Sequence, residues 1–147
     1  MAVLAEKYMK QEKWSLVESM TTFIKNDSVV PDILVKEAQI NLWLAQKRLG
    51  KMNKKEVGEC DFSGSTMDFR ICQYALLEEF DLAVGLVDRA LDTEQIIVKN
   101  LFEWPVLNEL RETDSFKELV QKKGIIKPEE TQLIYPQIEE IDETKCS

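Results

Sequence analysis

The residues that most often carry enzyme chemistry are few in this sequence and do not form a reactive set. It has three cysteines, Cys60, Cys72 and Cys146, and no histidine in 147 residues. Without histidine the chain lacks the usual general base and cannot hold a Cys–His catalytic pair. A zinc site would also lack its usual ligands, because no CxxC pair is present. We therefore expect no enzyme activity, no cofactor and no metal site.

Other patterns that look like reactive sites have simpler explanations. Gly58 and Gly64 lack the lysine and hydroxyl residue that a phosphate-binding loop places after its glycines. The acidic pairs Glu78-Glu79 and Glu129-Glu130 are adjacent residues, and adjacent side chains on a helix do not face each other. We interpret them as solvated charges, and Cys72 as a buried apolar residue rather than a reactive thiol.

The charge of the chain argues against nucleic acid and anionic membranes as partners. The formal net charge is −8 and the sequence pI is about 4.7, so phosphate groups repel the average surface. The densest basic run, residues 47–55, has no aromatic residues between its cations, and we interpret it as the solvated end of a helix. The alternative interpretation is a protein-binding patch, with the cations Arg48, Lys51, Lys54 and Lys55.

The N-terminal residues and the cysteine content favour a cytoplasmic protein. Residues 1–7 include an acidic residue and no long apolar run, so we do not expect a signal peptide. No stretch approaches the roughly 20 apolar residues that span a bilayer. An odd, sparse set of cysteines is not a disulfide framework, so a reducing compartment fits the sequence.

The composition and the apolar spacing predict an all-α fold, with one helical domain over residues 1–126. Only five glycines and four prolines are present, fewer turn residues than an all-β protein needs. Apolar residues recur at helical intervals and predict seven or eight helices, joined by short turns, with a further short helix at 54–60. The main ranges are 3–9, 14–24, 32–49, 67–77, 80–91, 94–102, 105–111 and 115–123.

Particular residues predict where these helices end and what they contact. Gly50 and Gly124 stand where left-handed C-caps belong. Thr93 or Asp92 is expected to cap the helix at 94–102. The broad apolar stripe of the helix at 32–49 predicts contacts on two sides. Within that stripe, Trp43 is either a core residue or an exposed anchor for a partner.

Two segments of the sequence share one spacing, with successive intervals of 6, 3, 4 and 3 residues. The residues that share it are Tyr8, Trp14, Val17, Thr21 and Ile24 in the first segment and Tyr74, Phe80, Ala83, Val87 and Ala90 in the second. The spacing predicts an aromatic residue before a turn and another after it, which together close a helical hairpin. Small residues at the next positions let the helices approach closely.

This spacing resembles the tetratricopeptide repeat. The segment from Tyr74 to Ala83 carries the match, and Ala90 falls where the family has its late small residue. In the first unit Val17 and Thr21 depart from the family's small and aromatic preferences. A weaker middle unit starts at residue 33, and residues 102–116 resemble the closing helices often found after the last such repeat.

The resemblance implies a right-handed α-solenoid of antiparallel helix hairpins, whose concave face holds a peptide or another protein. The family's carboxylate clamp uses Lys, Asn and Arg on the first helices, where this chain offers Glu6, Asp68, Cys72 and Ala75. A chaperone C-terminus is therefore not the expected ligand. The function implied is non-catalytic protein–protein interaction, and the alternative is a C-terminal sensor or regulatory part of a larger multidomain protein.

Residues 127–147 form an acidic C-terminal tail with a different composition. The tail contains six acids and two lysines, and Pro128 and Pro136 argue against one long helix. Its apolar residues are Leu133, Ile134, Tyr135, Ile138 and Ile141. We expect the tail to dock extended near the basic run at 47–55, on its own chain or on a second copy, which would form a homodimer. The alternative is a disordered tail.

Overall fold

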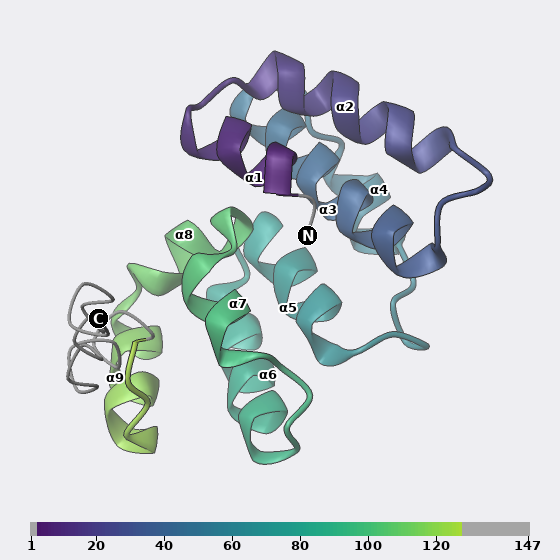
Figure 1. Cartoon of the computed structure of the whole chain (residues 1–147). Helices are drawn as coiled ribbons and strands as arrows, with labels where there is room; N and C mark the ends of the chain where they lie inside the picture. Colours follow the sequence, from purple (N-terminus) through teal and green to yellow (C-terminus); the bar gives the residue numbers. More distant parts are fainter. Residues whose placement is uncertain (1–2, 128–147) are drawn as a thin grey trace, which may run out of the picture.

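The structure is a computed structural model that describes residues 3–127. Over this range nine α-helices and one 3₁₀ helix follow one another without a strand, which confirms the all-α fold (Figure 1). The bounds are α1 Val3–Lys10, α2 Trp14–Asn26, α3 Asp32–Arg48, α4 Lys54–Glu59, α5 Met67–Leu76, α6 Phe80–Asp92, α7 Val98–Glu103, η1 Pro105–Leu107, α8 Asn108–Arg111 and α9 Asp114–Lys123. The expectations about the tail, including the homodimer, and about Cys146 lie outside the described residues.

Five helices end in the same backbone arrangement. A residue with positive φ follows the helix, and the next N–H bonds to the carbonyl five residues back, as in a Schellman motif. Gly50 and Gly124 occupy this position as predicted, with φ of 75° and 65°. Glu12, Glu78 and Glu94 occupy it in the other three, with φ of 55°, 61° and 55°. A glutamate gives no sequence signal for a left-handed residue, so the positive φ at these three positions was not predicted.

The predicted helix at 94–102 is wrong at its start, because α7 begins only at Val98. Thr93, expected to cap this helix, instead ends α6: its hydroxyl donates to the carbonyl oxygen of Arg89 at 2.8 Å. Glu94 then adopts the left-handed conformation, and the N–H of Gln95 bonds back to Ala90 at 2.8 Å. α6 therefore ends in a turn that includes Glu94 and Gln95, and α7 begins later than predicted.

The segment predicted as one helix at 105–111 is a 3₁₀ turn followed by the short helix α8. Pro105 has no backbone N–H, and the N–H of Leu107 bonds to Trp104 at 3.0 Å, which tightens the first turn. The remaining helices agree with the predicted ranges to within two residues at each end.

The described helices pack around one core. The most extensive packing joins α2 to α3 and α5 to α6, and α1 packs on α2 and α3 on α5. A row of aromatic side chains connects the parts of this core: Trp43 meets Phe62 edge-on at 6.2 Å, Phe62 stacks on Phe69 at 5.7 Å, and Phe69 meets Trp104 edge-on at 6.3 Å between ring centroids. The core therefore runs from α3 through α5 to the segment that precedes η1.

Trp43 is a core residue, so its assignment as an exposed partner-binding anchor is wrong. Its side chain is only 2% exposed, and its indole N–H donates to the Glu56 carboxylate at 3.4 Å. Seven residues of α3 are buried, on more than one face. The physical reason is the predicted two-sided coverage of α3, which leaves no surface on which Trp43 could meet a partner.

Four of the five positions of the shared spacing have the same burial class in the two hairpins, and the fifth differs, because Ile24 is half-buried and Ala90 is buried. Val17 and Ala83, the third members, are both 0% exposed, as is Ala90. The four aromatic members, Tyr8, Trp14, Tyr74 and Phe80, are partly buried and pack against the core. Each hairpin also closes with the same bond, because the carbonyls of Tyr8 and Tyr74 accept from residues 13 and 79 at 3.0 and 2.9 Å.

Candidate interaction surfaces

Reactive groups do not gather anywhere in residues 3–127. No cluster of three or more His, Cys, Asp or Glu side chains in this range could hold a metal ion. Burial raises the pKa of the Cys72 thiol well above its usual value, and burial with the nearby Asp61 raises the pKa of Cys60. Neither thiol is therefore activated as a nucleophile, and surfaces are the sites left to consider.

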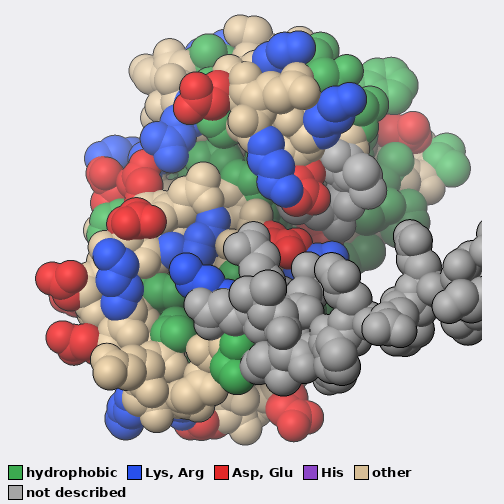
Figure 2. All heavy atoms as spheres, turned by 60° about the vertical axis from the view of Figure 1, so that its left-hand side comes forward, with side chains coloured by type: hydrophobic (Ala, Val, Ile, Leu, Met, Phe, Trp, Pro, Cys, Tyr) green, Lys and Arg blue, Asp and Glu red, His purple; other side chains and the backbone are tan. Residues whose placement is uncertain are grey.

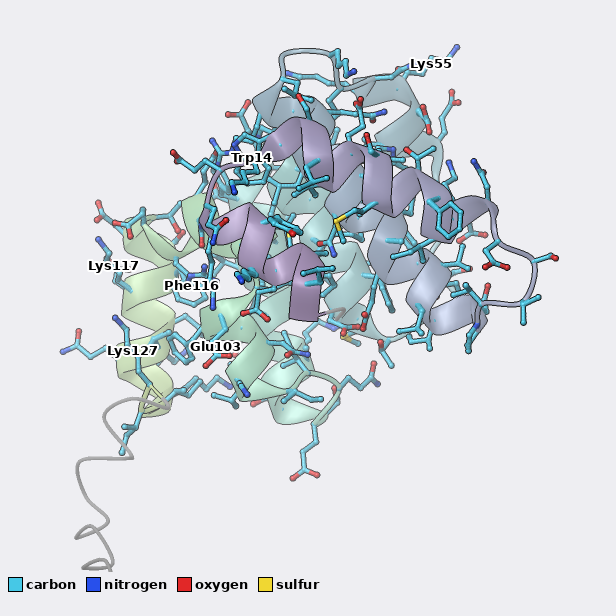
Figure 3. The ribbon with its side chains drawn as sticks, turned by 45° about the horizontal axis from the view of Figure 1, so that its top comes forward. Trp14, Lys55, Glu103, Phe116, Lys117 and Lys127 are labelled. Atoms are coloured by element: carbon cyan, nitrogen blue, oxygen red, sulfur yellow. The ribbon has the colours of Figure 1, made fainter. Side chains whose placement is uncertain are left out.

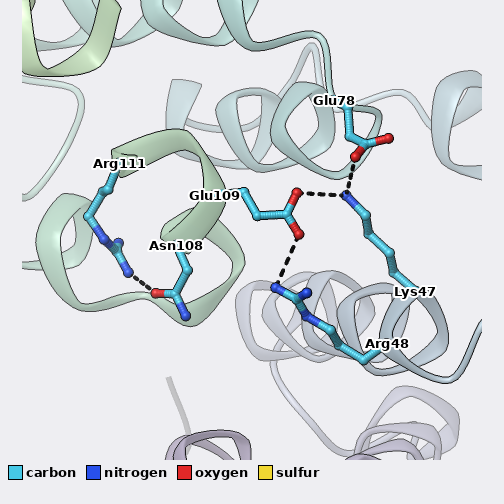
Figure 4. Close-up of polar contacts among 6 residues, drawn as sticks. All are labelled: Lys47, Arg48, Glu78, Asn108, Glu109 and Arg111. Atoms are coloured by element: carbon cyan, nitrogen blue, oxygen red, sulfur yellow. Dashed lines mark hydrogen bonds and ion pairs between the residues drawn. The ribbon is translucent and has the colours of Figure 1, made fainter. Parts of the chain in front are cut away.

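The first part of the basic run contacts acids of the same chain. The Lys47 ammonium lies 3.5 Å from the carboxylate of Glu109 on α8 and 3.9 Å from that of Glu78. Arg48 lies 3.2 Å from the other oxygen of Glu109 (Figure 4). Glu109 therefore links α8 to the C-terminal end of α3, and its single negative charge is shared between two cations there.

The remaining cations of the basic run lie at or after the end of α3. Lys51 pairs with Glu18 of α2 at 2.8 Å, whereas Lys54 and Lys55 begin α4, where Asn53 caps the helix. Lys55 extends away from the rest of the molecule (Figure 3), within reach of Glu59 at 3.9 Å. Three cations of the predicted partner-binding patch, Arg48, Lys51 and Lys55, therefore lie within 4 Å of acids of the same chain.

The segment from Trp104 to Leu110 covers the inner sides of several helices. η1 contacts α1, α3 and α5, and Trp104, Leu107 and Leu110 are 4%, 1% and 0% exposed. The Trp104 indole N–H donates to the side-chain oxygen of Asn41, in the middle of α3, at 2.9 Å. This segment is therefore part of the core and covers surface of α1, α3 and α5.

Asn41 is a structural residue that the sequence interpretation missed. It is only 2% exposed, although both its neighbours in sequence are apolar core residues. A polar residue inside an apolar stripe requires a buried hydrogen-bond partner. The position of Asn41 between two apolar residues therefore indicated that its side chain is hydrogen-bonded in the core. The sequence could not identify that partner, because Trp104 lies 63 residues further along the chain.

The largest apolar exposure on one helix lies on α2. Leu16 and Phe23 are 41% and 74% exposed, and Met20 between them is half-buried. We call these three residues the α2 stripe; they lie on a different side of the helix from the buried Val17 and Thr21. α2 runs along the outer edge of the molecule, beyond α1 and α3 (Figure 1). Their spacing of four and three residues was a sequence signal for a second apolar face.

A groove of about 380 Å³ lies between α7, α8 and α9. Its apolar floor includes Phe102, Phe116 and Val120, and the first two rings meet edge-on with centroids 6.2 Å apart. On the face that carries α8 and α9, apolar side chains are visible between acidic and basic ones (Figure 2). We call this feature the α7–α9 groove.

Charged residues surround the α7–α9 groove. Glu103, Lys117 and Lys127 lie on the same side of the molecule as Phe116 (Figure 3). Arg111 also lines it, and its guanidinium donates to the carbonyl oxygens of Leu101 and Trp104 at 3.0 and 3.1 Å. Burial lowers the pKa of Arg111 from its usual value, but an arginine remains charged at neutral pH.

Comparison with known proteins adds no relative. Neither the family models, nor the curated proteins, nor the solved structures contain a match to this chain. Within residues 3–127 no helix combines the length and the apolar character that crossing a bilayer requires.

Proposed function

We propose that the chain is a non-catalytic protein–protein interaction module, built as a tetratricopeptide-like right-handed α-solenoid. Two hairpins with the same spacing and the same closing hydrogen bond support the repeat architecture. Buried small residues at Ala83 and Ala90 allow the close helix approach that such a stack requires. A cytoplasmic location fits the free thiols Cys60 and Cys72.

The observation that carries the proposal is the exposure of the α2 stripe. Phe23 is 74% exposed, so a large apolar side chain is in contact with water. Binding of a partner on α2 would bury it. Neighbouring apolar side chains on one helix, bordered by polar residues, are typical of protein-binding surfaces. The partner is expected to be a protein or peptide with an apolar face, and neither nucleic acid nor a membrane.

The same stripe supports a second candidate function. A terminal unit of a helical repeat leaves an apolar flank that needs a cover. In a longer polypeptide, another domain would provide this cover, and the chain would act as a sensor or regulatory part. The two functions differ in whether the cover is a separate protein or part of the same polypeptide.

A capture experiment with matched variants tests the proposed function. Leu16→Ser changes the α2 stripe, and Leu82→Ser changes the equivalent residue, 66 positions later and 56% exposed on α6. We expect a protein from the native host to be enriched by the wild-type chain and by Leu82→Ser, but not by Leu16→Ser. Equal enrichment by all three would reject the α2 stripe, and no enrichment by any of them would reject the function.

A further inference from the structure

The α7–α9 groove lies where the described part of the chain ends. Lys127, the last described residue, is itself one of the residues that line it. The chain therefore reaches the edge of an apolar groove just before its own apolar and acidic residues begin. A groove of about 380 Å³ suits a few bulky side chains rather than a whole helix.

The sequence after Lys127 has the composition that this groove would accept. Leu133, Ile134 and Tyr135 form the densest apolar group, and Phe102, Phe116 and Val120 offer an apolar floor for it. Acids stand on both sides of that group, and Arg111, Lys117 and Lys127 contribute three cations to the lining against the two acids Glu103 and Glu112. Apolar contact would dominate the binding, and the charges would mainly set its direction.

Chain length permits this contact within one molecule. Ile134 lies seven residues beyond Lys127, and seven extended residues span at most about 25 Å. A connection of this length also raises the effective concentration of the segment to roughly the millimolar range. A contact within the chain is therefore favoured over the same contact between two copies at micromolar protein concentration.

The basic run at 47–55 is a weaker site for the same segment. Lys47 and Arg48 already contact Glu109, and Lys51 already contacts Glu18. An acidic segment would have to compete with these ion pairs, as it would in the groove, where Lys117 lies 3.7 Å from Glu112. The two sites differ in their apolar lining, and Phe102, Phe116 and Val120 favour the α7–α9 groove.

We propose that residues 128–147 dock in the α7–α9 groove of their own chain, with the group Leu133–Tyr135 on the floor. This segment then acts as an intramolecular ligand that covers the half-buried side chains of Phe102 and Val120. The proposal goes beyond the proposed function, because it concerns a different surface from the α2 stripe. A failed capture experiment on α2 would leave it unaffected.

Paramagnetic relaxation in the full chain tests the docking. A spin label is placed on a cysteine introduced as Gln137→Cys in a Cys60→Ser, Cys146→Ser background, in which the remaining native thiol, Cys72, is fully buried. Gln137 lies three residues after Ile134, so a docked segment holds the label near α9. We expect the amide signals of Phe116, Val120 and Gln121 to be broadened, and those of α2 to remain sharp.

Matched tail variants separate apolar docking from charge attraction. Ile134→Asp places a charge in the apolar group and should abolish the broadening and lower the melting temperature. Thr131→Asp adds the same charge at a polar position and should leave both unchanged. Circular dichroism of each variant establishes that the helices are intact.

Three results would overturn the proposal. Broadening that is absent from α9 in the wild-type chain excludes the contact. Broadening concentrated on residues 47–55 assigns the segment to the basic run. Equal broadening in a mixture of spin-labelled and isotope-labelled chains, together with a dimer mass in light scattering, assigns the contact to a second copy.

Discussion

The hairpins α1–α2 and α5–α6 share one spacing but differ in what covers them. In both, the third residue of the pattern is fully buried and the turn closes with the same backbone bond. α6 is additionally packed against α9 and α8, so Leu86 is only 8% exposed. Met20, the equivalent residue of α2, belongs to the exposed stripe. Equal periodicity therefore produces equal hairpins, but not equal surroundings.

The cover over α6 depends on residues far away in the sequence. Phe116 and Leu119 of α9 are buried, and Lys123 at its end lies 2.7 Å from the Asp88 carboxylate of α6. No helix in residues 3–127 does the same for the outer side of α2. This difference explains why an interaction surface is proposed on the first hairpin and not on the second.

The two hairpins also fill one inner position with different chemistry. Thr21 occupies the place that Val87 takes 66 residues later, and both are buried. The Thr21 hydroxyl donates to the carbonyl oxygen of Val17 at 2.7 Å, which satisfies its buried polar group. A residue that departs from the repeat pattern is therefore accommodated by a local hydrogen bond.

The largest expected effect comes from Trp104, which contacts Asn41 of α3 and Phe69 of α5. Trp104→Ala should lower the free energy of unfolding by about 3–5 kcal/mol, since it creates a cavity and leaves Asn41 without its donor. Trp104→Phe retains a ring and should cost less. Urea unfolding measures both variants, and a loss below about 1 kcal/mol for Trp104→Ala would show that the contact with η1 is not part of the core.

The second prediction compares equivalent positions at the two helix crossings. Ala83→Leu should overpack the crossing of α5 and α6 and cost about 1–3 kcal/mol. Val17→Leu, its counterpart in the first hairpin, adds only one carbon and should cost less. Thermal unfolding tests the pair, and an unchanged melting temperature for Ala83→Leu would contradict tight packing at that crossing.

The third prediction concerns the ion pair that ties α9 to α6. The hydrogen bond from Lys123 lowers the pKa of Asp88, so the folded state favours the charged carboxylate. The resulting stabilisation is present at neutral pH and is lost as the pH falls through this lowered pKa. Asp88→Asn should therefore melt below the wild-type chain at pH 7, with a smaller difference at pH 3 than at pH 7.

A control on the same helix defines this third test. Asp81→Asn removes an exposed acid of α6 without touching the contact to α9. It should not reproduce the pH-dependent difference. A gap between Asp88→Asn and wild type that is equally large at both pH values would contradict an electrostatic origin.

The smallest expected effect is on the uncovered side of α2. Phe23→Ser should change the free energy of unfolding by no more than about 0.5 kcal/mol, because the side chain makes few contacts in the folded chain. Urea unfolding measures the change. A destabilisation above 1 kcal/mol would mean that the α2 stripe is already covered, by a second copy or by another part of the chain, and would remove the contrast with α6.

Local features of this chain were predictable from the sequence. Helical intervals of apolar residues predicted most helices to within two residues, because a helix that buries one face repeats that face every three or four residues. Gly50 and Gly124 marked left-handed helix ends, because glycine has no Cβ to oppose positive φ. Glu12, Glu78 and Glu94 adopt the same conformation without that chemical signal.

Only the tertiary structure decided which faces are covered and which charges are paired. Trp43 had two interpretations until the second cover of α3 was seen, and Asn41 needed a partner 63 residues away. The Arg48 side chain became part of an ion pair only when α8 brought Glu109 next to it. Periodicity records which face of a helix is apolar, whereas its neighbours in space depend on long-range contacts that short sequence intervals do not contain.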